Sequence, residues 1–186
     1  MSEEKEKAIA FHKLVAEMRT NQREFWKTRD KDLLKKSIEL EKRVDEIILH
    51  ADGNDVPEDD NGSFFLEVAQ LRASSRQYFQ LKKIPGADQQ KIYDLYNAIK
   101  KSESKIDSLL IKWQDAQYIK QGYIIEYHVM ERYPRAMAHS VFSSQDENLA
   151  KIEYNDYLRR CQGGVMYYQA KKYLPPEGMP PIEDKQ

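Results

Sequence analysis

Apolar side chains recur in the first part of the chain with alternating steps of four and three residues. From about Glu3 to Arg29, the repeated positions are Phe11, Val15, Met18, Gln22 and Phe25, and all but Gln22 are apolar. After Asp30, which can cap a second helix, the same steps connect Leu33, Ser37, Leu40, Val44 and Ile47. This spacing places side chains on one face of a helix. Because the joint is short, we expect two amphipathic helices that form an antiparallel hairpin.

The same pattern then occurs a second time. Many residues of the first copy have a counterpart 53 positions later, among them Phe11/Phe64, Val15/Val68, Arg19/Arg72, Arg23/Arg76 and Trp26/Phe79. Further along, Leu40-Glu41 recurs 62 positions later as Ser102-Glu103, so the second copy carries nine extra residues. A duplicated helical hairpin explains this pattern.

The repeats divide the chain into successive regions. We expect an all-α fold in which two antiparallel hairpins form a four-helix core. The expected regions are a first hairpin over 1–50, an acidic linker over 51–62, a second hairpin over 63–121, a Tyr-rich and mostly helical region over 122–174, and a Pro-rich tail over 175–186. Ser63 is the expected N-cap of the third helix, and Ile84-Pro85-Gly86 should end that helix.

The C-terminal third has a different character. Nine of the twelve tyrosines lie at or after Tyr118. Residues 123–131 fit either a helix or an alternating strand. Ser144 to Glu147 has the form of a capping box that opens a helix, and residues 165–174 predict one more short helix after Gly163-Gly164.

Two serines interrupt the apolar stripes of the second and fourth predicted helices. Ser37 and Ser102 occupy positions where a large side chain would hold neighbouring helices apart. Either these are points of close helix approach, or each hydroxyl bonds back to its own helix.

Composition restricts the class of protein. The 186 residues are 33% charged and 40% hydrophobic, with a net charge of −1, which disfavours a dedicated nucleic-acid binder. Cys161 is the only cysteine, so an intramolecular disulfide is excluded. No signal-peptide pattern is present, and no apolar run approaches the roughly 18 residues of a membrane span. We therefore expect a cytoplasmic protein without membrane contact.

Catalytic and metal-binding motifs are missing from the sequence. His12, His50, His128 and His139 have no metal-ligand spacing, and there is no phosphate-binding loop, nucleophile elbow or dinucleotide fingerprint. These observations predict a protein that is not an enzyme and that uses neither a metal nor a cofactor.

The repeated arginine pairs are the main candidate for polar chemistry. Arg19 and Arg23 are one helical turn apart, and so are Arg72 and Arg76. If both pairs face one pocket, their guanidinium groups could hold a phosphate or carboxylate, with Lys27 extending the basic stripe and Trp26 or Phe79 stacking on a base. In the alternative interpretation each arginine pairs with an acidic residue of a neighbouring helix, for instance Glu41 or Glu103. A contact between copies is a third interpretation.

The tyrosines are a second candidate surface. Tyrosine combines a large contact area with a polar tip and is enriched at protein interfaces. Tyr127, Tyr157, Tyr167 and Tyr168 are the residues that we expect to contribute such contacts. The same side chains could equally fill a core whose edge is wet.

The first repeat resembles a short helical module of small proteins from bacteriophages and mobile elements of gut Bacteroidales-type bacteria. The resemblance rests on Phe11, Val15, Met18, Arg19, Gln22, Phe25, Trp26, Lys27, Arg29, Leu40, Glu41, Val44 and Asp45. The second copy departs from the pattern because Ser75 replaces the Gln and Gln80 replaces the Lys. The resemblance covers about the first two-thirds of the chain and implies an accessory protein of such an element, without naming an activity.

Two hypotheses of function follow. The leading one is a non-enzymatic phage or mobile-element accessory protein that acts through protein binding or self-assembly. The alternative is a protein that sequesters a phosphorylated small molecule or nucleotide, of an anti-defence type, by means of the arginine pairs.

Overall fold

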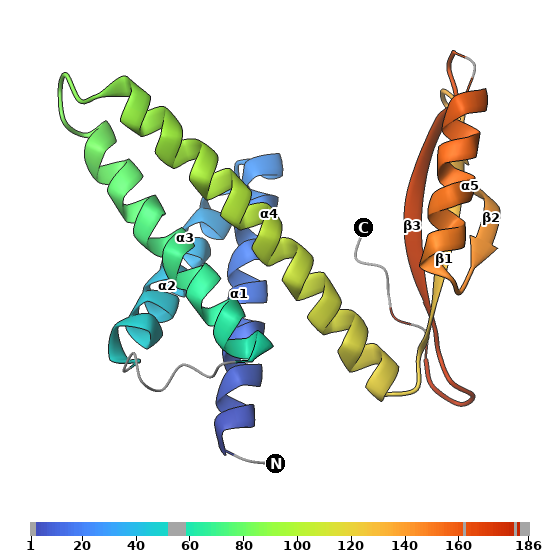
Figure 1. Ribbon diagram of the computed structural model, residues 1–186, viewed down its shortest axis with the longest axis horizontal. Helices are drawn as coiled ribbons and strands as arrows, with labels where there is room; N and C mark the ends of the chain where they lie inside the picture. The colour runs from blue at the N-terminus through green and yellow to red at the C-terminus, as the bar shows by residue number, and fades with distance from the viewer. Residues whose placement is uncertain (1–2, 52–58, 162, 181, 183–186) are drawn as a thin grey trace. The chain divides into compact units, whose positions relative to one another are not determined.

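The computed structural model describes residues 3–51, 59–161, 163–180 and 182 and divides the chain into two compact units, Met1–Lys112 and Trp113–Gln186 (Figure 1). We call them the helical unit and the sheet unit. The helical unit holds α1 (Glu3–Thr28), α2 (Lys31–His50), α3 (Asp60–Lys82) and most of α4 (Gln89–Lys120). The sheet unit holds the end of α4, then β1 (Ile124–Arg132), β2 (His139–Ser144), α5 (Glu147–Arg160) and β3 (Met166–Leu174).

The first hairpin forms as its sequence predicts. Arg29 adopts a left-handed backbone with φ 61°, and its N–H donates to the carbonyl of Phe25, which closes α1. Asp30 then caps α2, because its carboxylate accepts from the N–H of Asp32 at 2.8 Å. Two residues are therefore enough to reverse the chain.

The start of α3 corrects one prediction. The helix begins at Asp60 with Asp59 as its N-cap, so the predicted cap Ser63 lies inside the first turn. The Asp59 carboxylate accepts from the N–H groups of Asn61 and Gly62, and a carboxylate also suits the positive end of the helix dipole. Residues 52–58 of the predicted linker lie outside the described residues. The predicted break holds, because α3 ends at Lys82.

Equivalent residues of the two copies build the core of the helical unit. Val15 and Val68 are fully buried, and so are Val44 and Ile106 of the second and fourth helices. Aromatic rings of α1 contact rings of α3 in the other copy. His12 stacks on Phe64 with ring centroids 4.1 Å apart, and the ring centroids of Phe11 and Phe65 lie 5.1 Å apart. The four-helix core therefore brings the two copies together with an approximate two-fold correspondence.

The expectation of an all-α protein is wrong. Residues 124–174 contain a three-stranded antiparallel sheet in the order β2-β1-β3, so the chain is a mixed α and β protein. Residues 123–131 supply the central strand, and the predicted helix over 165–174 is instead β3, which pairs with β1 along its whole length from Ile124↔Leu174 to Arg132↔Met166. The stretch 166–174 is rich in tyrosine, which suits a pleated surface, and it gains its stability from a partner strand about 40 residues away in sequence.

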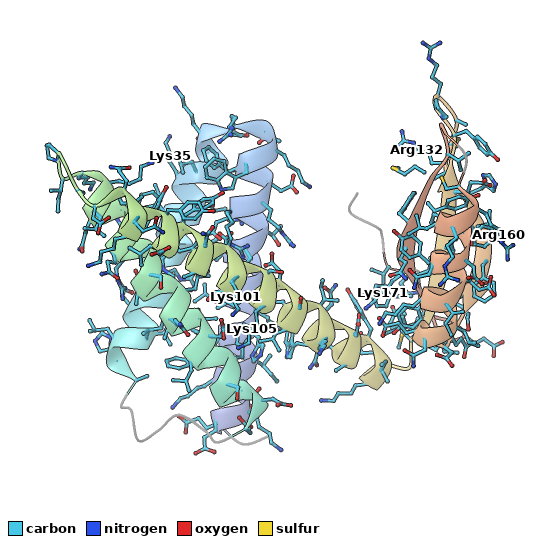
Figure 2. The ribbon with its side chains drawn as sticks, turned by 45° about the horizontal axis from the view of Figure 1, so that its top comes forward. Lys35, Lys101, Lys105, Arg132, Arg160 and Lys171 are labelled. Carbon is cyan, nitrogen blue, oxygen red and sulfur yellow. The ribbon has the colours of Figure 1, made fainter. Side chains whose placement is uncertain are left out.

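One helix covers the sheet. The face that carries Ile125 and Val129 packs against α5, whose Ala150 is buried. Asp146 is the N-cap of α5, whereas the capping-box prediction placed the cap at Ser144; the Ser144 hydroxyl accepts from the N–H of Asp146 just before the helix. In Figure 2, Arg132 and Lys171 mark positions on β1 and β3.

Among the described residues, no helix is both long enough and apolar enough to span a lipid bilayer.

Candidate functional site

The repeated arginines of the helical unit pair crosswise with acidic residues of the other copy. Arg19, on α1, donates through Nε to Asp107 at 2.9 Å and through Nη1 to Glu103 at 2.9 Å, and both acceptors lie on α4. Arg72, on α3, donates through Nε to Asp45 at 2.8 Å and lies 2.8 Å from Glu41, both on α2. Each hairpin therefore supplies the arginine for one cluster and the carboxylates for the other.

Gln22 joins the two clusters. Its carbonyl oxygen accepts from Arg19 Nη1 at 2.7 Å, and its amide nitrogen donates to Glu41 at 2.7 Å. Because Glu41 also pairs with Arg72, one polar network crosses the unit from Asp107 to Asp45. These two hydrogen bonds explain why Gln22, the one polar residue in the apolar stripe of α1, is polar.

The ionisation of these groups fits a structural role. Burial alone would lower the pKa of Arg19 and of Arg72, but the hydrogen bonds and charges of their carboxylate partners raise each pKa above its ordinary value. Burial would raise the pKa of Asp45, whereas Arg72 and Arg76 together bring that pKa below its ordinary value. For the pair of Arg72 and Asp45, both shifts favour the charged forms, as a buried ion pair requires.

The outer basic residues are more exposed. Arg23 is 51% exposed and lies 3.8 Å from Asp107, and Arg76 is 49% exposed and lies 3.1 Å from Asp45. Lys27 pairs with Glu24 on its own helix. The structure contains the pairing of arginines with Glu41 and Glu103 that was the alternative interpretation of the sequence. The structure does not bring the four arginines to one open pocket.

Aromatic side chains gather near the turn of the first hairpin, and we call this group the first tip. It consists of Phe25, Trp26, Arg29 and Leu34. The rings of Phe25 and Trp26 lie 5.6 Å apart, and the Arg29 guanidinium lies 4.4 Å from the Trp26 ring centre. Trp26 is nevertheless 59% exposed, and Leu34 on α2 is exposed as well.

The second hairpin repeats this arrangement at equivalent positions. Its tip consists of Tyr78, Phe79, Lys82 and Tyr96. The rings of Tyr78 and Phe79 lie 5.2 Å apart, and the Lys82 amino group lies 5.4 Å from the Tyr78 ring centre. Phe79 is 60% exposed, and Tyr96 is exposed on α4. Both copies thus hold one exposed and one half-buried aromatic ring with a basic side chain over the group.

The tyrosines of the sheet unit are distributed over both faces of the sheet. Tyr167 donates to Glu131 at 2.9 Å, and its ring lies 5.1 Å from the ring of Tyr157 on α5. Burial and the neighbouring Glu131 raise the pKa of Tyr167 to about 12. Tyr127 lies on the same face, with its ring 5.5 Å from the amino group of Lys171, whereas Tyr168 is half-buried on the opposite face. The four predicted interface tyrosines therefore do not form one surface.

Two polar clusters of the sheet unit had no signal in the sequence. Asp115, near the end of α4, accepts from Lys171 at 2.6 Å and from Tyr173 at 2.8 Å. Nδ1 of His128 lies 2.8 Å from the Ser140 hydroxyl, and Nε2 lies 2.7 Å from Glu126, a contact at ion-pair distance without hydrogen-bond geometry. Asp115 is more than 50 residues from Lys171 and Tyr173, and Ser140 is 12 residues from His128, so the fold brings these partners together, whereas Glu126 lies two residues from His128 on the same strand.

A metal site is not found among the residues that the structure describes. A small hollow lies between α5 and the sheet, lined in part by Tyr127, Glu147, Ala150 and Gln169, and its basic residue Lys171 is already paired with Asp115.

Comparison with known proteins found no matching family model, no matching curated protein and no matching solved structure.

Proposed function

We propose that this chain is a non-enzymatic protein-binding module that presents the two hairpin tips to partner proteins. The observation that carries the proposal is the duplication of an exposed ring, Trp26 or Phe79, beside a half-buried ring, Phe25 or Tyr78, with a basic side chain over the group. Arg29 lies over the rings of Phe25 and Trp26, and Lys82 lies over the ring of Tyr78. Large exposed apolar groups that gather in one place are typical of interaction sites. Tryptophan, tyrosine and arginine also dominate the binding energy of interfaces.

The buried network supports the same proposal. Arg19 and Arg72 form ion pairs with carboxylates of the other hairpin and so stabilise the packing of the two hairpins. The aromatic tips are exposed in both copies. Two equivalent tips can bind two sites of one partner or two copies of it, and linked sites strengthen binding through effective concentration. An accessory protein of a phage or mobile element, as the resemblance of the first repeat implies, is the proposed setting.

Replacement of one exposed aromatic residue in each tip tests the proposal. The wild type, the double variant Trp26→Ser/Phe79→Ser and the control Leu66→Ser/Tyr93→Ser are immobilised and exposed to a lysate of a Bacteroidales-type bacterium. The control residues are exposed to a similar extent, but the first copy has lysines at their equivalent positions. We expect specific proteins that the wild type and the control retain and the tip variant loses.

The outcome against the proposal is equally definite. If the tip variant retains the same proteins in the same amounts, or if the control loses them as well, the tips are not the binding surface. Circular dichroism of each variant shows that the helices are intact, which is expected because the replaced side chains are exposed.

A further inference from the structure

The strand β3 forms a free edge of the sheet. The strand order β2-β1-β3 leaves one side of β3 without a partner strand, and Figure 1 shows β2 and β3 on opposite sides of β1. On an edge strand every second residue turns its N–H and C=O groups outward, where they can pair with another strand. Within the described part of the chain, no hydrogen bond reaches these outward groups of Met166–Leu174.

The two edges of the sheet differ in how well they can accept another strand. The edge at β2 is six residues long, and its pairing shifts register between Val129 and Met130. Such short and bulged edges resist further pairing. The edge at β3 has nine residues in one continuous register and contains no proline. At about 3.4 Å per residue it offers roughly 30 Å of regular strand.

The charge on β3 restricts the choice of partner. Lys171 already pairs with Asp115, and Lys172 stands opposite Glu126 in the sheet. An antiparallel pairing of β3 with itself about Ala170 would keep these lysines apart, because it places Gln169 opposite Lys171 and Tyr168 opposite Lys172 of the second copy. The outer pairs would be Tyr167 with Tyr173 and Met166 with Leu174. A register centred on Lys171 would instead oppose that lysine to itself.

We propose that β3 pairs antiparallel with β3 of a second copy of this chain, with Ala170 on the two-fold axis, and so joins two three-stranded sheets into one of six strands. The side chains opposite one another in this register are aromatic pairs, apolar pairs or a lysine with a neutral residue, all of which a sheet tolerates. This self-association uses the sheet unit and does not depend on the hairpin tips.

A matched pair of charge substitutions tests the register. Gln169 is exposed and faces Lys171 of the second copy. Gln169→Lys should weaken the dimer by roughly fivefold, because two like-charge pairs are created by symmetry, and Gln169→Glu should not weaken it. Sedimentation of the full chain over a concentration series measures both dissociation constants. A protein that stays monomeric up to about 200 μM, far above the dissociation constants of specific dimers, or a dimer with the same response to both variants, would overturn the proposal.

Disulfide trapping tests the edge independently. In the background Cys161→Ser, Ala170→Cys should form a covalent dimer on mild oxidation, because opposite residues of antiparallel strands lie about 4.5–5.5 Å apart, within the range of a disulfide. Ser143→Cys on β2 is the matched control and should remain monomeric. Equal trapping at both positions, or none at Ala170→Cys, would contradict the pairing of β3.

The same measurements separate this inference from the function of the tips. The variant Trp26→Ser/Phe79→Ser should dimerise as the wild type does. If it loses self-association while Gln169→Lys retains it, the tips mediate assembly and the edge pairing is wrong.

Discussion

Each buried arginine of the helical unit has its partners on a helix of the other copy. Arg19 reaches Asp107 and Glu103, and Arg72 reaches Asp45 and Glu41. Each hairpin therefore neutralises the buried charges of the other. This arrangement is expected if a single hairpin once associated with a second copy of itself. The arginines and carboxylates that the sequence repeats are thus explained by packing between hairpins.

Removal of one buried arginine should be far more costly than removal of its exposed neighbour. Arg19→Met leaves Asp107 and Glu103 partly buried without their main cation and should lower the free energy of unfolding by about 3–5 kcal/mol. Arg72→Met should cost a similar amount, because its cluster is equivalent. Arg23→Met removes a half-exposed partner and should cost at most about 1 kcal/mol. Urea denaturation measures all three, and equal costs for Arg19→Met and Arg23→Met would contradict the structural role.

His12 should make the stability depend on pH. The residue is buried, its ring stacks on Phe64, and burial lowers its pKa below the ordinary value. Because the unfolded chain then binds the proton more readily, the contribution is fully present above about pH 6.5 and is lost as the pH falls through the lower folded pKa.

The second copy supplies the matched variant, since Phe65 occupies the position equivalent to His12. Between pH 7.5 and 5 the wild type should lose up to about 1 kcal/mol per pH unit more than His12→Phe. Denaturation at several pH values measures the difference. If both proteins have the same pH dependence in this range, His12 does not carry the effect.

At the scale of elements, periodicity predicted the helices and failed for the strands. The stripes through Val15, Val44, Val68 and Ile106 gave four helices with nearly the observed bounds, because an amphipathic helix displays its pattern locally. The stretch 166–174 has no such pattern of its own. It becomes a strand because β1 offers a matching edge, and long-range pairing of this kind cannot be read from one segment.

The two serines in the apolar stripes should respond differently to alanine. The Ser37 hydroxyl is buried and has no hydrogen-bond partner among the described residues. Ser37→Ala should therefore leave stability unchanged or raise it by up to about 1 kcal/mol, because it removes an unsatisfied polar group.

Ser102 is the natural comparison, because its hydroxyl bonds to Glu67, a group whose pKa is lowered chiefly by Lys105 and also by this serine. Ser102→Ala should lower the free energy of unfolding by about 1 kcal/mol. Calorimetry measures both variants, and a destabilised Ser37→Ala would show that its hydroxyl has a partner after all. Lys105, labelled in Figure 2, lies on α4 and pairs with Glu67.

At the scale of the molecule, the division into units coincides with the end of the duplication. The helical unit ends at Lys112, which is the position equivalent to His50 at the end of α2. The remaining residues of α4 belong to the sheet unit, where Asp115 and Tyr118 contact β3. The duplication could be read from the sequence. The pairing of the arginines with Glu41 and Glu103 was one of three interpretations, and the partners Asp45 and Asp107 were not foreseen. The contacts of Arg29 and Lys82 with aromatic rings could not be predicted from the sequence, because they depend on the geometry at the ends of α1 and α3.

The helical unit should fold without the rest of the chain. Its buried core, from Phe11 to Leu110, lies entirely before residue 113. A fragment of residues 1–112 should therefore unfold cooperatively and retain the helical circular dichroism of the unit. In this fragment Val15→Asp should abolish the transition, because an unpaired carboxylate would be buried. A fragment that shows no cooperative transition would mean that the sheet unit is required for folding.

The two equivalent tips are the central claim, and single-tip variants test it most directly. The amount of each bacterial protein retained by immobilised wild type, Trp26→Ser, Phe79→Ser and the double variant is measured by quantitative mass spectrometry. Each single variant should lose part of the bound protein to a similar extent, and the double variant should lose nearly all of it. Full retention by one single variant together with complete loss by the other would contradict the equivalence of the tips, and full retention by the double variant would contradict the proposed function.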